Sequence, residues 1–244
     1  MKTITYHMKH ALALITALTL VATNSVFADE APDLDDPKVR AEILAGVTLR
    51  EDLEERGPEG TKLFYDPDSQ APYTGWTKRL YDNGKVKALG RARGGKADGP
   101  FTAWHENGKK AAKFTFKDGK QEGLATEWHD NGQKGLECTF KDGKQDGLTT
   151  SWHKNGKKSG EGTFKDGEKE GPFTKWHENG KKGSEGAYRN GKKDGPWTFW
   201  RQDGKEWTEG VYKDGEKEGL WTKWDEDGKE VSRKNYKDDE EVAK

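Results

Sequence analysis

The sequence predicts an all-β protein: an elongated, single antiparallel β-sheet of repeated β-hairpins, with a short N-terminal helix. Three observations support this fold class. A 24-residue pattern recurs without slips, Asn-Gly and Asp-Gly pairs recur within each period, and aromatic residues and glycines are evenly spaced. The chain holds 10 Trp, 9 Phe, 7 Tyr and 31 Gly in 244 residues. Regular spacing of these residue types is typical of many short strands and turns.

Residues 1–28 are predicted to be a secretory signal peptide. Lys2 and Lys9 flank the start of an apolar run, Ala11–Ala22, and Val26–Ala28 fits a small-residue cleavage site. An uncleaved anchor helix is the alternative, but the run is too short to cross a bilayer. We therefore expect an exported, soluble protein, periplasmic or extracellular, with no transmembrane segment after signal cleavage.

The charge of the mature chain argues against nucleic acid as a partner. Residues 29–244 hold 41 basic and 44 acidic side chains, a net charge of −3. The charge is uneven, since residues 29–74 carry 13 acids and 5 bases, whereas residues 75–98 carry 7 bases and 2 acids. These two segments are expected to attract one another or to bind separate partners.

The chain before the repeats is expected to form two parts. Residues 29–49 are predicted to be an acidic linker, partly disordered and partly helical, and residues 50–74 an N-terminal cap. The disorder is expected over Asp29–Pro37, and the amphipathic stretch Val39–Gly57 is expected to be a helix that docks on the sheet.

Seven 24-residue units are predicted, spanning residues 75–242. Each unit opens with a glycine and contains one Asn-Gly or Asp-Gly hairpin signal, and the five middle units contain a second one half a period later. One column of the repeat holds tryptophan: Trp104, Trp128, Trp152, Trp176, Trp200 and Trp224. A second column holds phenylalanine or tyrosine: Phe116, Phe140, Phe164, Tyr188, Tyr212 and Tyr236. These residues are expected to form the core between stacked units.

The lengths of the two loops decide which residues share a face of the sheet. Two-residue turns would place Trp104 and Phe116 on opposite faces, whereas three-residue loops would place them on the same face. The second choice gives one apolar face throughout, so it is the predicted one. Glycines on that face are then expected to leave room for a neighbouring indole: Gly162, Gly186 and Gly210.

The pattern E-N-G-K-K…F-K-D-G-K-x-x-G-L/P-x-T-x-W resembles the MORN-variant repeat over about residues 50–242. The stretch 52–76 is similar to the cap of such proteins, with a strand around Leu63–Tyr65. The resemblance implies the repeated-hairpin fold. Members are often described as YwqK-type antitoxins, and MORN arrays as membrane-attachment or protein-binding scaffolds. A cytoplasmic antitoxin role fits poorly with a signal peptide.

Polar columns are candidates for chemistry, but they are expected to be structural. A histidine column comprises His105, His129, His153 and His177, with Arg201 and Asp225 in the later slots. Equivalent positions lie about 9.6 Å apart, too far for two of them to share one metal ion. An acidic column precedes the unit-opening glycines: Asp98, Glu122, Asp146, Glu170, Asp194 and Glu218. No catalytic residue, metal site or cofactor is predicted, and lysine-rich turns that touch anionic lipid or polysaccharide are a minor alternative.

Apolar residues outside the regular columns gather at the C-terminal end. The candidate binding residues are Trp197, Phe199, Trp207, Val211 and Trp221, and the predicted face assignment puts them on the otherwise polar face. A contact patch for a partner is one interpretation, and closure of the sheet end by the chain itself is the other. The single cysteine, Cys138, is expected to be packed, with a disulfide between two chains as the alternative.

The sequence therefore favours an exported, non-enzymatic repeat scaffold that binds another envelope or secreted protein through its sheet. A polysaccharide-binding module that uses the tryptophan columns is an alternative function. An antitoxin or immunity protein that neutralises an exported toxin is a second.

Overall fold

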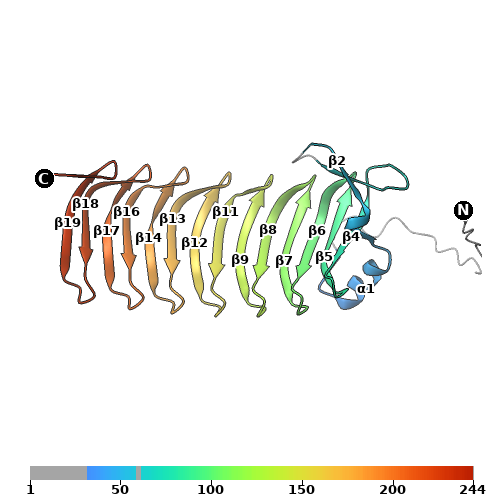
Figure 1. The fold of residues 1–244 in the computed structure, drawn as a ribbon, viewed down its shortest axis with the longest axis horizontal. Helices are drawn as coiled ribbons and strands as arrows, with labels where there is room; N and C mark the ends of the chain where they lie inside the picture. Colours follow the sequence, from blue (N-terminus) through green and yellow to red (C-terminus); the bar gives the residue numbers. More distant parts are fainter. Residues whose placement is uncertain (1–31, 59–61, 244) are drawn as a thin grey trace, which may run out of the picture. The chain divides into compact units, whose positions relative to one another are not determined.

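The computed structural model describes residues 32–58 and 62–243, so the predicted signal peptide lies outside the described residues. Contacts divide the chain into Met1–Pro32 and a second unit, Asp33–Lys244, which holds the repeats. That second unit is mostly strand, and it forms a long 18-stranded sheet, so the predicted fold class is confirmed (Figure 1). None of its described helices is long and apolar enough to span a membrane.

The N-terminal elements are helix α1 (Pro37–Ala45), β1 (Thr48–Leu49), a 3-10 helix η1 (Arg50–Asp52), β2 (Glu54–Arg56) and β3 (Leu63–Tyr65). The repeat strands are β4 (Gly75–Leu80), β5 (Val86–Arg93), β6 (Lys96–Trp104), β7 (Lys110–Lys117), β8 (Lys120–Trp128), β9 (Lys134–Lys141), β10 (Lys144–Gln145), β11 (Gly147–Trp152), β12 (Lys158–Lys165), β13 (Glu168–Trp176), β14 (Lys182–Arg189), β15 (Lys192–Lys193), β16 (Gly195–Trp200), β17 (Glu206–Lys213), β18 (Glu216–Trp224), β19 (Glu230–Lys237) and β20 (Glu240–Val242).

From β4 onward the sheet is an antiparallel meander in which strands next in sequence pair with one another. The short strand β10 and the strand β11 that follows it both pair with β9. In the same way, β15 and β16 both pair with β14. Parallel pairing of β1 with β4 covers one edge of the sheet, and β20 covers part of the other edge by pairing with β19. Short strands at both edges limit pairing with other chains.

The Asn-Gly loop has the predicted three-residue geometry. In the second unit the His105 amide donates to the Lys109 carbonyl at 2.8 Å, and the Gly108 amide donates to the His105 carbonyl at 2.8 Å. Gly108 has φ +83°, a left-handed conformation that glycine adopts without a Cβ penalty. The same arrangement recurs in the other units.

A β-bulge next to this loop reverses the predicted faces. Trp104 pairs with Lys110, but Ala103 pairs with Ala112, so Ala111 is an extra residue in β7. Because side chains alternate along a strand, one extra residue moves the following side chains to the other face. The bulge recurs in every unit at the equivalent tryptophan or, in β4, at Leu80.

The Asp-Gly loop differs from the predicted three-residue loop. Lys117 pairs directly with Lys120, and both turn residues are left-handed, with φ +50° at Asp118 and +86° at Gly119. This is the two-residue type I′ geometry, which matches the twist of the flanking strands. The second loop therefore leaves Phe116 on the opposite face from Trp128.

The sheet consequently has two different faces, and the predicted single apolar face is wrong. Phe101 lies opposite Phe114, and their rings stack at 4.6 Å, so they share a face with Phe116. Thr102 lies opposite Lys113, and both share the other face with Trp104. We call the first the Phe/Tyr face and the second the Trp-column face.

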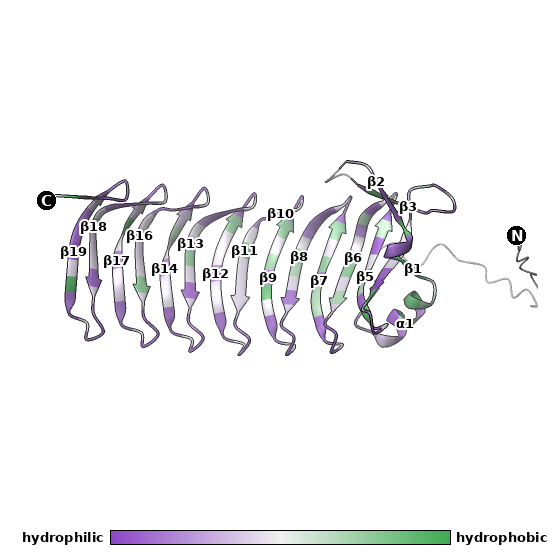
Figure 2. Ribbon diagram, viewed as in Figure 1, coloured by the Kyte–Doolittle hydropathy of each residue, from purple (hydrophilic) through white to green (hydrophobic). Residues whose placement is uncertain are grey.

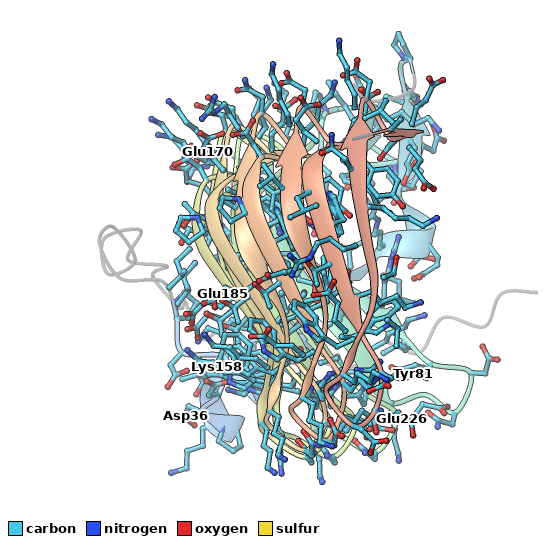
Figure 3. The ribbon with its side chains drawn as sticks, turned by 90° about the vertical axis from the view of Figure 1, so that its left-hand side faces the viewer. Asp36, Tyr81, Lys158, Glu170, Glu185 and Glu226 are labelled. Carbon is cyan, nitrogen blue, oxygen red and sulfur yellow. The ribbon has the colours of Figure 1, made fainter. Side chains whose placement is uncertain are left out.

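Helix α1 covers the N-terminal end of the Trp-column face. Leu34, Leu89 and Trp104 form the buried cluster, against which Ile43 and Leu44 of the helix pack. In Figure 3, Lys158 and Glu185 lie on the same side of the sheet as Asp36, which caps the helix. Hydrophobic colouring is concentrated in α1 and in strands β5 to β9 (Figure 2).

Two predictions for this region are corrected. The helix ends at Ala45 rather than Gly57, because Gly46 terminates it and the β-branched pair Val47-Thr48 leads into β1. The segment Asp33–Asp36 is ordered against the sheet, since Leu34 is only 2% exposed. Residues 29–31 lie outside the described residues.

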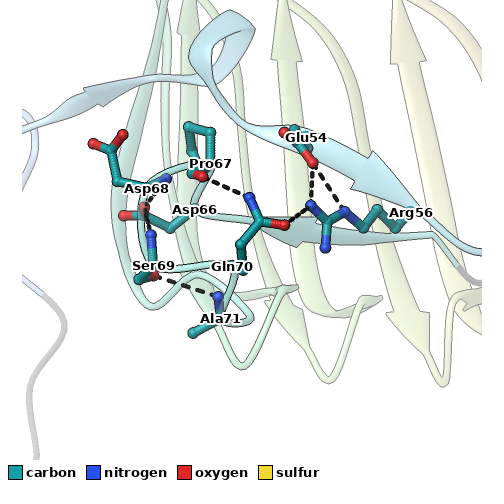
Figure 4. Close-up of polar contacts among 8 residues, drawn as sticks. All are labelled: Glu54, Arg56, Asp66, Pro67, Asp68, Ser69, Gln70 and Ala71. Carbon is teal, nitrogen blue, oxygen red and sulfur yellow. Dashed lines mark hydrogen bonds and ion pairs between the residues drawn. The ribbon is translucent and has the colours of Figure 1, made fainter.

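The hairpin of β2 and β3 lies on the other side, against the start of the Phe/Tyr face. Phe64 lines a cavity with Phe101 and Phe114, and the guanidinium of Arg50 lies 4.3 Å from the Phe64 ring centre. Arg56 bonds both Glu54 and Gln70, which ties the hairpin to the following turn (Figure 4). The cap therefore encloses the first unit from both faces, and the predicted strand at Leu63–Tyr65 is confirmed.

Candidate binding surface

The tryptophan column lies along the Trp-column face, and five of its rings lie beside a cation. Arg40 of α1 lies 5.3 Å from the ring centre of Trp104, which is 6% exposed. The later tryptophans are half-buried. Four of them lie under a lysine ammonium of the preceding strand, at 5.3 to 5.9 Å: Lys110 on Trp128, Lys134 on Trp152, Lys158 on Trp176 and Lys182 on Trp200.

Charges on the Trp-column face are paired within the face. Lys134 bonds Glu137 at 2.5 Å, and the same pair recurs in the next two units as Lys158–Glu161 and Lys182–Glu185. Leucines stand exposed near the opposite end of these strands, with Leu124 at 60% and Leu148 at 57%. This face therefore offers rings and leucines with its charges already neutralised.

The histidine column joins each unit to the next. In each pair the histidine Nε2 lies 2.8 to 2.9 Å from the carbonyl oxygen of the next tryptophan: His105 to Trp128, His129 to Trp152, His153 to Trp176 and His177 to Trp200. A carbonyl only accepts, so Nε2 carries the proton. Tyr81 and Arg201 occupy the same slot and also donate to the carbonyl of the next unit's tryptophan, Trp104 and Trp224 respectively. Groups of three His, Cys, Asp or Glu side chains suited to a metal are absent from the described part of the chain.

The acidic column also holds neighbouring turns in place. The carboxylate of Glu122 accepts from the Asp142 amide at 3.0 Å, and that of Glu170 accepts from the Asn190 amide at 2.9 Å. The donating amide belongs to the type I′ turn of the following hairpin. Two other members of the column form ion pairs with arginine, Asp98 with Arg93 and Asp194 with Arg189, so the column is structural in both ways.

Along the later units, the Phe/Tyr face is packed by matching a large residue to a small one across adjacent strands. An ideal Cβ at Gly210 would lie 2.2 Å from the Trp221 ring, and one at Gly186 would lie 2.3 Å from the Trp197 ring. Gly162 stands in the same relation to Phe173, at 2.4 Å. Room for a neighbouring ring at these three glycines is confirmed, although the rings come from outside the regular tryptophan column.

The candidate C-terminal residues are split by the structure. Trp197 and Trp221 are 2% and 6% exposed, and Phe199 stacks against both at 5.8 and 6.5 Å. These three lie on the Phe/Tyr face. Val211 lies opposite Pro196 on the Trp-column face. The prediction that all five residues share one face is therefore wrong, because the bulge reverses the alternation of side chains along the strand.

Trp207 and Val211 are the exposed members of the set, at 43% and 40%, and Trp207 lies at the bulge of β17. Together with Phe199 and Trp221 it lines a groove of about 610 Å³. Val231 of the edge strand, 55% exposed, lines the same groove.

Sequence reasoning missed a lysine row on the Phe/Tyr face. Lys193 lies 4.6 Å from the ring centres of both Trp197 and Tyr212, and Lys217 lies 4.9 Å from those of Trp221 and Tyr236. Lys169 occupies the equivalent slot one unit earlier. The signal was present as a change within one column, from Ala97, Gln121 and Gln145 to Lys169, Lys193 and Lys217.

Burial on the Phe/Tyr face shifts the pKa values of several groups. Burial, followed by repulsion from nearby lysines, lowers the pKa values of Lys169 and Lys193. Burial raises the pKa of the Cys138 thiol, which is 2% exposed and lies opposite Ala125. The thiol is therefore packed, as expected, and little of it is available as a thiolate.

Comparison with known proteins identifies the repeat. The sequence model of the MORN repeat variant matches residues 97–118, 145–166 and 217–238. Each matched segment is one Asn-Gly or Asp-Gly hairpin that runs to the first residue of the following type I′ turn. The predicted resemblance is confirmed for these three segments. No curated protein matches the chain.

Solved structures give only distant likenesses. A crystal structure of TarM is 12% identical with a TM-score of 0.24, and the match covers 54% of this chain and 24% of that one. A mutant of S. aureus TarM in complex with Fondaparinux, alpha-GlcNAc-glycerol and UDP is 12% identical with a TM-score of 0.21, and the match covers 65% and 24%. This chain therefore spans about a quarter of those proteins, and TM-scores of this size do not indicate a shared overall fold.

Proposed function

We propose that this chain is a non-enzymatic binding scaffold, exported from the cell, that holds another envelope or secreted protein against its sheet. One observation carries the proposal: beyond the N-terminal cap, both faces of the described sheet present repeated side chains to solvent. The histidines and carboxylates, which would be the obvious acid–base groups, instead hold neighbouring units together. Extended surfaces of stacked repeats commonly serve recognition.

Site-specific photo-crosslinking on the full chain tests the proposal. A photoreactive phenylalanine analogue is placed at Trp207 on the Phe/Tyr side, at Leu148 on the Trp-column face, or at Asn83 in a loop as the control. We expect an adduct with one protein of the cell envelope from one face only. Adducts at no position, or the same adducts at all three, would contradict a protein-binding role, and a glycan adduct would point to the polysaccharide alternative.

Export is tested separately. Mass spectrometry of the protein recovered from the producing cells is expected to find Asp29 as the N-terminal residue, because the small-residue site ends at Ala28. Recovery of an intact N-terminus from the cytoplasm would overturn the export part of the proposal. An antitoxin-like role is a special case of the same proposal, in which the captured protein is a toxin.

A further inference from the structure

The lysines on the Phe/Tyr face of the last units differ from the other lysines that lie over rings. On the Trp-column face, some of the lysines that lie over rings are followed by a glutamate three residues later in the sequence. Each of these lysines forms an ion pair with that glutamate, as Lys158 does with Glu161. On the Phe/Tyr face, Lys193 and Lys217 have no carboxylate partner among residues 32–58 and 62–243. The same is true of their neighbours Lys169, Lys175 and Lys223.

Strand register places almost no acid on this part of the Phe/Tyr face. Lys175 lies opposite Ser184, and Lys223 lies opposite Thr208. Two acids lie near this part of the face: Glu241 of β20, which is bonded to Lys234 at 2.6 Å, and Asp239, whose carboxylate accepts from the Lys217 backbone amide at 2.8 Å. The face therefore carries a local excess of positive charge, although the whole chain has a formal net charge of −1.

These lysines lie where their electrostatic attraction for an incoming anion would be strong. Their ammonium groups are partly desolvated over aromatic rings, and burial together with mutual repulsion lowers the pKa values of Lys169 and Lys193. Charge attraction is stronger in such a partly desolvated setting than in bulk water. A bound carboxylate would reduce the repulsion between the lysines, and it would be the ion-pair partner that the described residues do not provide.

Geometry and apolar contacts favour a peptide as the carrier of those carboxylates. Lys169, Lys193 and Lys217 repeat every second strand, about 9.6 Å apart. Three residues of an extended peptide span about the same length. The adjacent groove ends at Trp207 and Val231, which are exposed apolar anchors suited to an aliphatic side chain.

We propose that the Phe/Tyr face of residues 169–236 binds an extended acidic segment of the partner protein, with carboxylates at every third position and an aliphatic residue at the groove. This inference rests on the proposed protein-binding function. The chain's own acidic stretch is a poor occupant for a second copy, since Leu34 is buried and Asp35 is bonded to Lys110.

Fluorescence anisotropy with the full chain tests the inference. The probe is a labelled twelve-residue peptide that repeats Glu-Pro-Leu, and its Gln-Pro-Leu counterpart is the neutral control. We expect the acidic peptide to bind about tenfold or more tightly than the neutral one, with the difference shrinking at high salt.

Paired variants locate the site. Lys193→Gln with Lys217→Gln is expected to weaken acidic-peptide binding about tenfold, and Lys193→Arg with Lys217→Arg to stay within about threefold because the charge remains. Lys158→Gln with Lys182→Gln removes two lysines from the Trp-column face and is expected to change binding less than twofold. Unchanged circular dichroism and melting temperature show that each variant is folded.

Three results would overturn the inference: equal binding of the two peptides, equal losses in the two glutamine variants, or binding of a heparin oligosaccharide in place of the acidic peptide. If the crosslinked partner is still captured by the Lys193→Gln, Lys217→Gln variant, the proposed scaffold function stands and only this site fails. If no partner is captured on either face, the broader proposal fails as well.

Discussion

At the scale of single residues, the Phe/Tyr face depends on where a side chain is missing. Gly210 has no Cβ, and the six-membered and five-membered rings of Trp221 occupy the space where one would stand. Beside Phe114 the next strand carries a small residue, Ala125, since the adjoining Lys113 pairs with Thr126. Size is therefore matched across strands rather than within one strand.

Gly210→Ala should consequently lower the free energy of unfolding by about 2 kcal/mol, because the new methyl group overlaps the Trp221 ring and the indole must move. Chemical denaturation followed by circular dichroism measures this. Gly46→Ala is the control, since nothing lies within 4 Å of its ideal Cβ, and it should change stability by less than about 0.5 kcal/mol. Equal effects of the two substitutions would show that the ring does not occupy the position described.

At the scale of elements, adjoining hairpins are joined by side chains that cross from one unit to the next. His129 donates to the Trp152 carbonyl at 2.9 Å, and Arg201 makes the equivalent bond to the Trp224 carbonyl. The last unit places Asp225 in this slot, and its carboxylate accepts from its own loop, at 3.0 Å from the Asp227 amide. Within the described residues, the donor column therefore ends at Arg201.

His129→Leu should cost about 1 kcal/mol of unfolding free energy, because the Trp152 carbonyl loses its donor. His129→Arg should lose less than half of that, since arginine serves in the same slot at position 201. Hydrogen exchange of the amides in β9 and β11 reports the local effect. An arginine variant as unstable as the leucine variant would contradict the assigned role.

Docking of α1 should depend on pH through Asp35. Its hydrogen bond to Lys110, with a further contribution from Lys113, lowers the pKa of the carboxyl below the ordinary 3.8. A carboxyl whose pKa is lowered on folding stabilises the protein above its ordinary pKa, and this contribution is lost as the pH falls through the lowered value.

The pair is partly exposed, so its contribution is about 0.5 kcal/mol or less. In acid titrations followed by the NMR signal of the Trp104 indole N–H, Asp35→Asn should therefore weaken the change below pH 4. An unaltered titration in the variant would assign the acid sensitivity to other groups.

At the scale of the whole repeat region, units contact only their neighbours, so one unit can be removed if the new junction packs. Deleting residues 171–194 would set Trp197 over Gly162, which is a large residue on a small one. Deleting residues 147–170 would set Phe173 over Cys138 instead.

Both deletion variants should keep a β-sheet spectrum, and the first should be more stable than the second by about 1–3 kcal/mol, the range for overpacking. Thermal and urea unfolding of the two proteins, which have the same length, gives the comparison. Equal stability would mean that size matching across strands does not govern the junction.

The sequence alone determined the period, the positions of the strands and turns, and the unit boundaries. These features are local: Asn-Gly and Asp-Gly fix turns, and a left-handed glycine such as Gly108 fixes the end of its loop. Only the tertiary structure decided which side chains share a face. A single extra residue, Ala111, reverses the alternation, and its bulge is set by pairing with the opposite strand rather than by local preference. For the same reason Val211 lies on the opposite face from Trp197 and Trp221. The unpaired lysines of the Phe/Tyr face likewise became visible only once the register was known.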